Sequence, residues 1–137
     1  MKKLLIIAMF VLLGTAVKAQ VVIIANKSVS AGSINKSKLA DIYTLSIKNW
    51  DNGDKIVVFD LKNDGDVKDK FYGYLGKSNS DFKKIWMKAQ LTGEGFAPEA
   101  LGSDGEVLKR VSSTQGAIGY VSKGAANSSV KVLAEIN

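Results

Sequence analysis

The chain has 137 residues, with 19 basic and 13 acidic side chains, no cysteine and no histidine. Without cysteine there is no disulfide framework, thiolate nucleophile or cysteine metal site, and without histidine the commonest general base and zinc ligand are missing. These absences point away from an enzyme, and the basic residues do not cluster among aromatic ones as a nucleic-acid partner would require.

Residues 1–19 have the pattern of a secretory signal. A basic start is followed by an unbroken apolar run over residues 4–13 and by small residues that end at Ala19. We expect cleavage before Gln20, because the apolar run is shorter than the roughly 20 residues of a spanning helix, which is the alternative interpretation. The remaining residues, 20–137, carry 16 basic and 13 acidic side chains. We expect them to form one exported domain, periplasmic or secreted, with no stable membrane span.

Residues 21–25 form an apolar run that is rich in β-branched side chains. A strand with two apolar faces suits the interior of a sheet that is covered on both sides. The polar loop over residues 26–33 follows at the carboxyl end of this strand, where open α/β sheets bind ligands. Its candidate hydrogen-bonding residues are Asn26, Ser28 and Ser30, and the alternative is a solvated turn.

A helix and a second strand follow this loop. Asn35 is a suitable N-cap for an amphipathic helix over residues 36–45. Turn residues at 51–54 separate this helix from a strand over residues 55–61. The polar turn over residues 62–66 again lies at the carboxyl end of a strand, and we expect the loops after the first two strands to converge.

Two further helices are predicted in the middle of the chain. The first spans residues 67–75, with Val67, Phe71, Tyr74 and Leu75 on one face, and ends at Gly76. The second begins after Ser78 or Ser80 and ends at Gly93, and its apolar stripe is typical of core packing. The stripe consists of Phe82, Ile85, Trp86 and Ala89, and the opposite face carries Lys83, Lys84 and Lys88. An irregular connection follows.

The last third of the chain is organised around residues 115–121, QGAIGYV, in which a polar turn runs into a buried strand. Gly119 indicates close approach by another group, because glycine otherwise weakens a strand. Upstream, Ser103 and Glu106 form a capping box for a fourth helix. Residues 130–133 alternate in polarity, as edge strands do. The elements together predict an α/β fold in which helices flank a small, mostly parallel sheet.

Three stretches resemble, in the same order, the phosphate-binding proteins of ABC transporters. They are residues 34–50 (INKSKLADIYTLSIKNW), residues 60–71, which are similar to a strand-to-helix anion loop, and residues 115–121. The similarity covers most of the chain after residue 19 and is greatest for short, single-domain members of this family. It implies the fold of one lobe of a type II periplasmic binding protein. It also implies an exported protein that binds a small anion such as phosphate, without catalysis or a cofactor.

The chain departs from this family in two ways. The full binding proteins enclose the anion between two lobes, whereas this chain has residues for about one, so its site would be half exposed unless the chain dimerises or meets a partner. The family's anion loop reads Ser-Gly-Thr at a helix N-terminus, and the matching positions here are Gly65, Asp66 and Val67. Asp64 and Asp66 add negative charge, and a carboxylate about 4 Å from a phosphate costs roughly 1–4 kcal/mol.

The first hypothesis is a solute-binding-like module that holds a small anion and uses no metal or cofactor. Backbone N–H groups and polar side chains in three loops would provide the hydrogen bonds. The candidate ligand-binding residues are Asn26, Ser28, Ser30, Gly65, Asp66, Val67, Thr114 and Gln115. For each of them the alternative role is loop solvation or capping.

The alternative hypothesis is an envelope protein–protein interaction module that keeps the lobe fold but has lost the anion site. It would bind an envelope or transporter protein through Trp50, Phe96 and Tyr120, which we expect to be exposed. An enzyme is the least favoured hypothesis, although carboxylates alone can hold calcium, and here the EF-hand pattern is missing. The carboxylates with suitable spacing for such a site are Asp60, Asp64 and Asp66.

Overall fold

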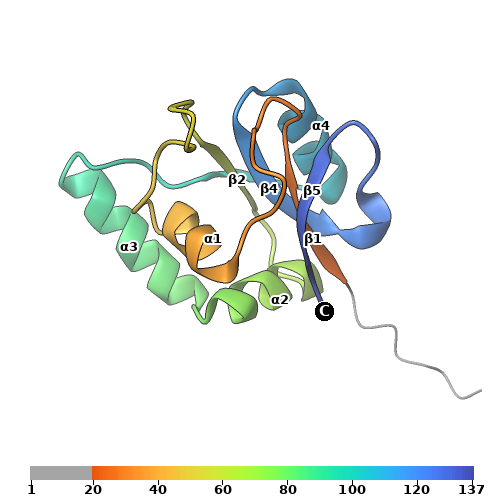
Figure 1. The fold of residues 1–137 in the computed structure, drawn as a ribbon. Coiled ribbons are helices and arrows are strands. Elements are labelled where there is room, and N and C mark those ends of the chain that lie inside the picture. The colour runs from red at the N-terminus through yellow and green to blue at the C-terminus, as the bar shows by residue number, and fades with distance from the viewer. Residues whose placement is uncertain (1–19) are drawn as a thin grey trace, which may run out of the picture.

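The computed structural model describes residues 20–137, so the predicted secretory signal lies outside the described residues. Five strands, four α-helices and one short 3-10 helix follow one another in this part of the chain (Figure 1). They are β1 (Val21–Ala25), α1 (Lys36–Tyr43), β2 (Val57–Leu61), α2 (Asp66–Leu75), α3 (Asn79–Leu91), β3 (Glu99–Leu101), α4 (Asp104–Ser113), β4 (Ala117–Ser122), η1 (Lys123–Ala125) and β5 (Lys131–Ile136). None of these helices is long and apolar enough to cross a membrane.

The five strands form one sheet in the order β3-β2-β4-β1-β5. β2 pairs in parallel with β3 and β4, whereas β1 pairs antiparallel with β4 and β5. β1 therefore runs against the other four strands. The predicted α/β fold is confirmed, with a mixed sheet that has two parallel and two antiparallel pairings. The expected convergence of the loops after the first two strands is wrong, because strands of opposite direction end at opposite edges of a sheet.

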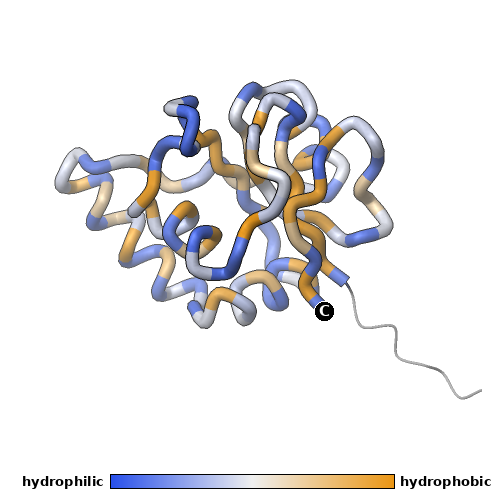
Figure 2. Tube along the Cα trace, viewed as in Figure 1, coloured by the Kyte–Doolittle hydropathy of each residue, from blue (hydrophilic) through white to orange (hydrophobic). Residues whose placement is uncertain are grey.

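Helices cover both faces of this sheet. α4 packs against β4, β2 and β1 on one face, and α2 packs against β1, β4 and β5, with α1 beside it. α3 lies outside α1 and α2 (Figure 1), where the Trp86 indole donates a hydrogen bond to the Tyr43 carbonyl at 2.7 Å. Figure 2 shows hydrophobic residues concentrated along the strands and hydrophilic residues along the outer helices and loops.

The aromatic side chains of β4, α1 and α2 meet in the core. The ring of Tyr120 stacks on that of Phe71 at a centroid distance of 3.8 Å, and Tyr43 meets Phe71 edge-on at 4.7 Å. All three side chains are fully buried. Such contacts add to the free energy of burial, so they hold α1 and α2 on the sheet.

The other predicted elements are present, with boundaries that differ by a few residues, but β3 was not expected. It pairs with β2 over three residues only, and of these three only Leu101 is buried, so the sequence has no apolar run there. On α2 the buried face is also rotated by one position from the predicted stripe. It consists of Lys68, Phe71, Tyr72 and Leu75.

Two glycines within residues 115–121 are required for steric reasons. A Cβ at Gly119 would lie 2.8 Å from Cγ1 of Val107 and 3.2 Å from Cγ2 of Val111, so glycine allows α4 to contact the sheet. The predicted close approach is confirmed. Gly116 has φ +74°, and a Cβ there would lie 2.3 Å from the Lys55 carbonyl oxygen. Both positions therefore exclude a larger residue.

Replacing Gly119 with alanine should lower the free energy of unfolding by about 1–3 kcal/mol, because the added methyl group overpacks the contact with α4. Urea unfolding followed by circular dichroism measures this change. Gly124→Ala is the control, since a Cβ at Gly124 has no neighbour within 4 Å. A Gly119→Ala variant as stable as the parent would contradict the close packing.

Candidate functional site

The residues predicted to bind an anion lie in two groups at the two opposite edges of the sheet that the ends of the strands form. Asn26 follows β1 and lies beside the start of β4, where its N–H donates to the Ala117 carbonyl at 2.9 Å. Thr114 and Gln115 precede β4 and so lie at the same edge. Residues 65–67 follow β2, which is parallel to β4, and lie at the other edge. The two groups cannot form one site.

The first group is largely occupied by contacts within the fold. The Asn26 amide donates to the carbonyls of Val111 and Ser112, at 2.8 and 3.1 Å, and so satisfies the C-terminal end of α4. The Gly116 N–H donates to the Ser28 hydroxyl at 3.0 Å. Asn26 and Ser28 therefore have the alternative role, in which polar side chains cap backbone groups within the fold. The other predicted residues at this edge are Ser30, Thr114 and Gln115.

The second group lines a cleft of about 210 Å³ at the carboxyl ends of β2 and β3. The N-termini of α2 and α4 both open onto it, because each helix follows directly after one of these parallel strands. The cleft is lined by Leu61, Asn63, Gly65, Asp66, Val67, Lys68, Gly102, Ser103 and Asp104. Sequence reasoning found the residues after β2 only. It missed those after β3 because β3 itself was not predicted.

The N-terminus of α2 differs from those of the other helices in residues 20–137. The Asn35, Ser78 and Ser103 side chains each accept a hydrogen bond from a backbone N–H in the first turn of α1, α3 and α4. At α2 the N-cap is Gly65, which provides no such bond. The first N–H groups of α2 therefore have no side-chain cap where they adjoin the cleft, and the helix dipole adds partial positive charge.

At α4, Ser103 is the N-cap as predicted, and its hydroxyl accepts from the Glu106 N–H at 3.2 Å. The Glu106 carboxylate accepts from the Gly102 N–H at 2.9 Å, one residue before the N–H that a capping box would use. The predicted reciprocal bond is therefore shifted by one residue. This bond fixes the backbone that forms the β3 side of the cleft.

Lys68 is the cleft residue that sequence reasoning most clearly missed. It is only 8% exposed, and its ammonium lies 3.8 Å from Oδ1 of Asp64 and 3.5 Å from the Lys62 carbonyl oxygen. The available signal was its spacing, because Lys68 occupies the first position of the apolar stripe that continues at Phe71 and Tyr72. A lysine within such a stripe buries its stem and presents its charge at the end of the helix.

Acidic side chains reduce the positive potential of the cleft. Asp66 is exposed in the first turn of α2. Asp104 is already bonded, because its Oδ2 accepts from the Ser122 hydroxyl at 2.5 Å and from the Ser122 N–H at 3.2 Å. Asp66 is thus the carboxylate that would most directly repel an anion.

A buried hydrogen-bonded carboxylate lies beneath the cleft. Asp60 is 3% exposed and accepts hydrogen bonds from the Tyr72 hydroxyl at 2.5 Å, from the Tyr120 hydroxyl, and from the Leu61 N–H at 2.9 Å. These bonds tie the end of β2 to α2 and β4. Burial is the main cause that raises the pKa of Tyr72 and of Tyr120 well above the ordinary value, and the hydrogen bond and negative charge of Asp60 raise it further. Both hydroxyls therefore remain donors.

The carboxylates suggested for calcium do not form a metal cluster. Asp60 is buried and bonded to tyrosine hydroxyls, whereas Asp64 and Asp66 are exposed. Within residues 20–137, no group of three or more His, Cys, Asp or Glu side chains is arranged to hold a metal ion.

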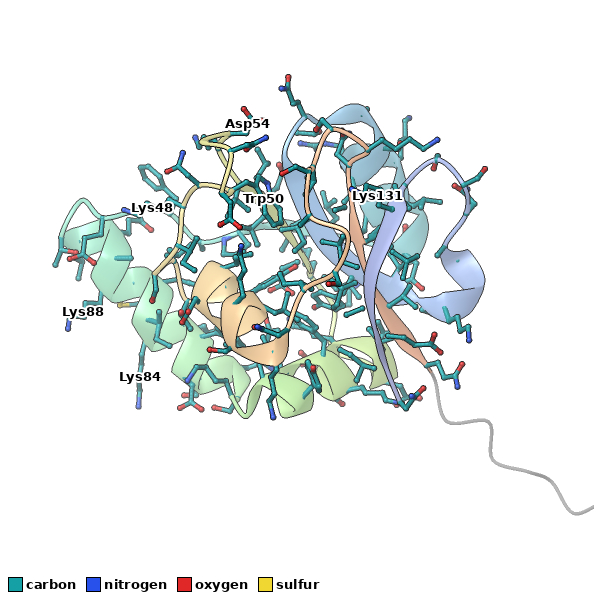
Figure 3. The ribbon with its side chains drawn as sticks, in the orientation of Figure 1. Lys48, Trp50, Asp54, Lys84, Lys88 and Lys131 are labelled. Atoms are coloured by element: carbon teal, nitrogen blue, oxygen red, sulfur yellow. The ribbon has the colours of Figure 1, made fainter. Side chains whose placement is uncertain are left out.

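The aromatic residues suggested for a protein partner are mostly buried. Trp50 is a core residue whose indole donates to the Gly116 carbonyl at 2.9 Å (Figure 3), and Tyr120 is also fully buried. Phe96 alone of the three is exposed, at 77%. It adjoins an apolar groove of about 420 Å³ formed by Leu45, Ile47, Ile56, Val57, Val58 and Pro98, among others.

The sequence from residue 15 to residue 135 matches the model of the PBP superfamily domain. Among functionally curated proteins, none matches the sequence. Similar solved structures include an ABC-type phosphate transport receptor from Vibrio cholerae, with 19% identity and a TM-score of 0.67. A structure from Clostridium perfringens with bound phosphate has 21% identity and a TM-score of 0.66, and PstS from Borrelia burgdorferi has 20% and 0.64.

These three alignments cover 84%, 84% and 85% of this chain, but 46%, 45% and 47% of the solved chains. The chain therefore spans less than half the length of these structures. At this level of identity the similarity establishes a shared fold.

Tyr120→Phe should lower the free energy of unfolding at neutral pH by about 1.5–3 kcal/mol, because it removes a hydrogen bond to a buried carboxylate. Tyr74→Phe is the matched control, since Tyr74 is half-buried and its hydroxyl is outside the Asp60 contacts. Urea unfolding of both variants measures the difference. Equal losses in the two variants would show that the Tyr120 bond contributes nothing specific.

The same contact predicts a dependence on alkaline pH. Above about pH 10 the unfolded chain loses the Tyr120 proton while the folded chain keeps it, so the free energy of unfolding falls as pH rises. Tyr120→Phe removes this contribution. Its stability should decline less steeply than that of the parent between about pH 10 and 11, by up to about 1.4 kcal/mol. Parallel declines would contradict a raised pKa.

Proposed function

The chain belongs to the PBP superfamily, and from this premise we propose that it is an exported solute-binding-like protein that holds a small oxyanion such as phosphate, without catalysis. The site is the cleft between the N-termini of α2 and α4. The observation that carries the proposal is the uncapped N-terminus of α2, which opens onto a cleft beside a nearly buried lysine. The phosphate named for two of the similar structures supports this choice of anion.

Each part of the cleft has a role in anion binding. The N–H groups at the start of α2 donate hydrogen bonds to anion oxygens, and the helix dipole favours negative charge there. Lys68 supplies a full positive charge from the first turn of the same helix. Across the cleft, the backbone at residues 102–104 forms the second wall. These groups recognise charge and oxygen geometry.

The cleft also limits affinity. Asp66 lies at its rim, and repulsion from a carboxylate about 4 Å away costs roughly 1–4 kcal/mol. The cleft is open to solvent between its two walls, so part of the anion remains hydrated. We expect binding in the millimolar to high micromolar range, and a stronger interaction wherever a second protein surface closes over the cleft.

Calorimetric titration of the chain with phosphate tests the proposal. Lys68→Met should weaken binding by about tenfold or more, because hydrogen bonds to charged groups are worth roughly 1.5–3 kcal/mol. Asp66→Asn should strengthen it by about tenfold, because a repulsive carboxylate is removed without loss of the helix terminus. Lys27→Met, an exposed lysine in the loop after β1, is the charge-matched control for Lys68→Met.

The proposal fails if neither heat nor a thermal shift is detected with millimolar phosphate or sulfate. It also fails if phosphate binds but Lys27→Met weakens binding as much as Lys68→Met does, because the attraction would then come from net charge and not from the cleft. Thermal unfolding of each variant in the absence of phosphate separates a lost site from a lost fold.

A further inference from the structure

The outer face of α3 exposes hydrophobic side chains that the fold does not use. Met87 is 63% exposed and Leu91, four residues later, is 81% exposed. Phe96, in the connection that follows the helix, is 77% exposed. Of the large hydrophobic side chains left exposed in residues 20–137, only Val132 lies elsewhere, on β5. The exposed apolar surface of this part of the chain is therefore concentrated at one end.

This end of the molecule is held in place. The Glu94 N–H donates to the Ala89 carbonyl at 2.8 Å, and the Lys48 ammonium donates to the Glu94 carbonyl. Gly95 packs against Leu45, because a Cβ at Gly95 would lie 3.4 Å from Leu45 Cδ1. The exposure of Phe96 is thus a property of an anchored connection.

Three lysines flank Met87 and Leu91 on the same face of α3. Lys83 lies one turn before Met87 in a single row, and Lys84 and Lys88 form the adjacent row. All three are exposed, and none forms a salt bridge within the described residues. The side chains of Lys84 and Lys88 point away from the body of the protein (Figure 3).

The charges on α3 are mostly positive. Asp81 is the only carboxylate of α3, and it accepts from the Ser78 N–H at 2.9 Å in the capping box at the start of the helix. Lys84 and Lys88 are like charges at i and i+4, an arrangement that weakens a helix. Lys84 has an acidic neighbour, Asp81, three residues before it, whereas Lys83 and Lys88 have no acidic residue three or four positions away on this helix.

We propose that this lysine–apolar surface, made of Lys83, Lys84, Met87, Lys88 and Leu91, binds a lipid bilayer that carries anionic headgroups. The apolar side chains enter the interfacial region, and the lysine ammoniums contact the headgroups. The surface is a convex helix face with lysine and no arginine, whereas protein interfaces are depleted in lysine and enriched in arginine. Lipid is therefore favoured over a protein partner, and the anion cleft residues take no part.

Flotation with vesicles tests this proposal, with phosphatidylcholine alone compared with a mixture of phosphatidylcholine and phosphatidylglycerol. The chain should bind the mixed vesicles and lose binding as salt is raised. The double variant Lys84→Gln/Lys88→Gln should bind them roughly 25-fold more weakly, at about fivefold for each lysine. Leu91→Ser should weaken binding by about tenfold, because an exposed apolar side chain no longer enters the interface.

Matched controls lie on other elements. Lys27→Gln/Lys109→Gln removes two exposed lysines outside α3, and Val132→Ser removes the remaining exposed hydrophobic side chain. Both should bind the mixed vesicles as the parent does. Residues 1–19 are identical in every variant, so any binding that they contribute appears equally in all.

Three outcomes would overturn the proposal. The parent could fail to prefer vesicles that contain phosphatidylglycerol, or the α3 variants could bind as the parent does, or the controls could lose as much binding as the α3 variants. Retention of the parent on an immobilised acidic protein, lost in the α3 variants while vesicle binding is unchanged, would assign the surface to a protein partner instead. All substitutions are at exposed positions, and thermal unfolding confirms that each variant is folded.

Discussion

The antiparallel insertion of β1 between β4 and β5 determines which residues can act together. Because β1 runs against the other four strands, its carboxyl end meets the amino end of β4. The polar loop after β1 consequently lies beside the end of α4, where Asn26 satisfies the last carbonyls of that helix. The opposite edge is left to β2 and β3, and the helices that follow them bring two N-termini to one cleft.

Beneath this cleft, the buried Asp60 carboxylate joins the elements that form it. Its hydrogen bonds from Tyr72 and Tyr120 link the last residues of β2 to α2 and β4. A buried carboxylate without such partners would be strongly destabilising, so the contact is effective only while all of its members are present. The position of the α2 N-terminus therefore depends on the same side chains that stabilise the sheet, and stability and ligand binding are coupled in this region.

Local chemistry made most of the fold predictable from the sequence. Asn35 and Ser103 identified helix starts, and Gly119 indicated a close approach, which in the structure is that of α4. Each of these signals depends on residues that are near in sequence or on sterics at one position. β3 was missed because a strand of three residues, two exposed and one buried, carries no periodic signal. The direction of β1 was missed because an apolar run does not indicate which strands it pairs with, or in which direction. As a result, the residues of the predicted site lie at two opposite edges of the sheet.

The residues of the cleft illustrate the same limit. Residues 65–67 were identified through a local strand-to-helix turn, whereas Gly102 and Ser103 join them only through the pairing of β3 with β2. Lys68 could have been found, because a lysine in an apolar helical stripe is visible in the sequence. The lysine–apolar face of α3 was visible too, but its apolar members were hidden among core residues until their exposure was known.

Assignment of the backbone amide resonances, followed by titration with phosphate, tests most directly where an anion binds. If the uncapped start of α2 is the site, the largest saturable shifts are those of Gly65, Val67 and Gly102, with the amides of Ser28 and Gly116 unchanged. Saturable shifts centred on Ser28 and Gly116, or no shift at either edge of the sheet with millimolar phosphate, would contradict the account.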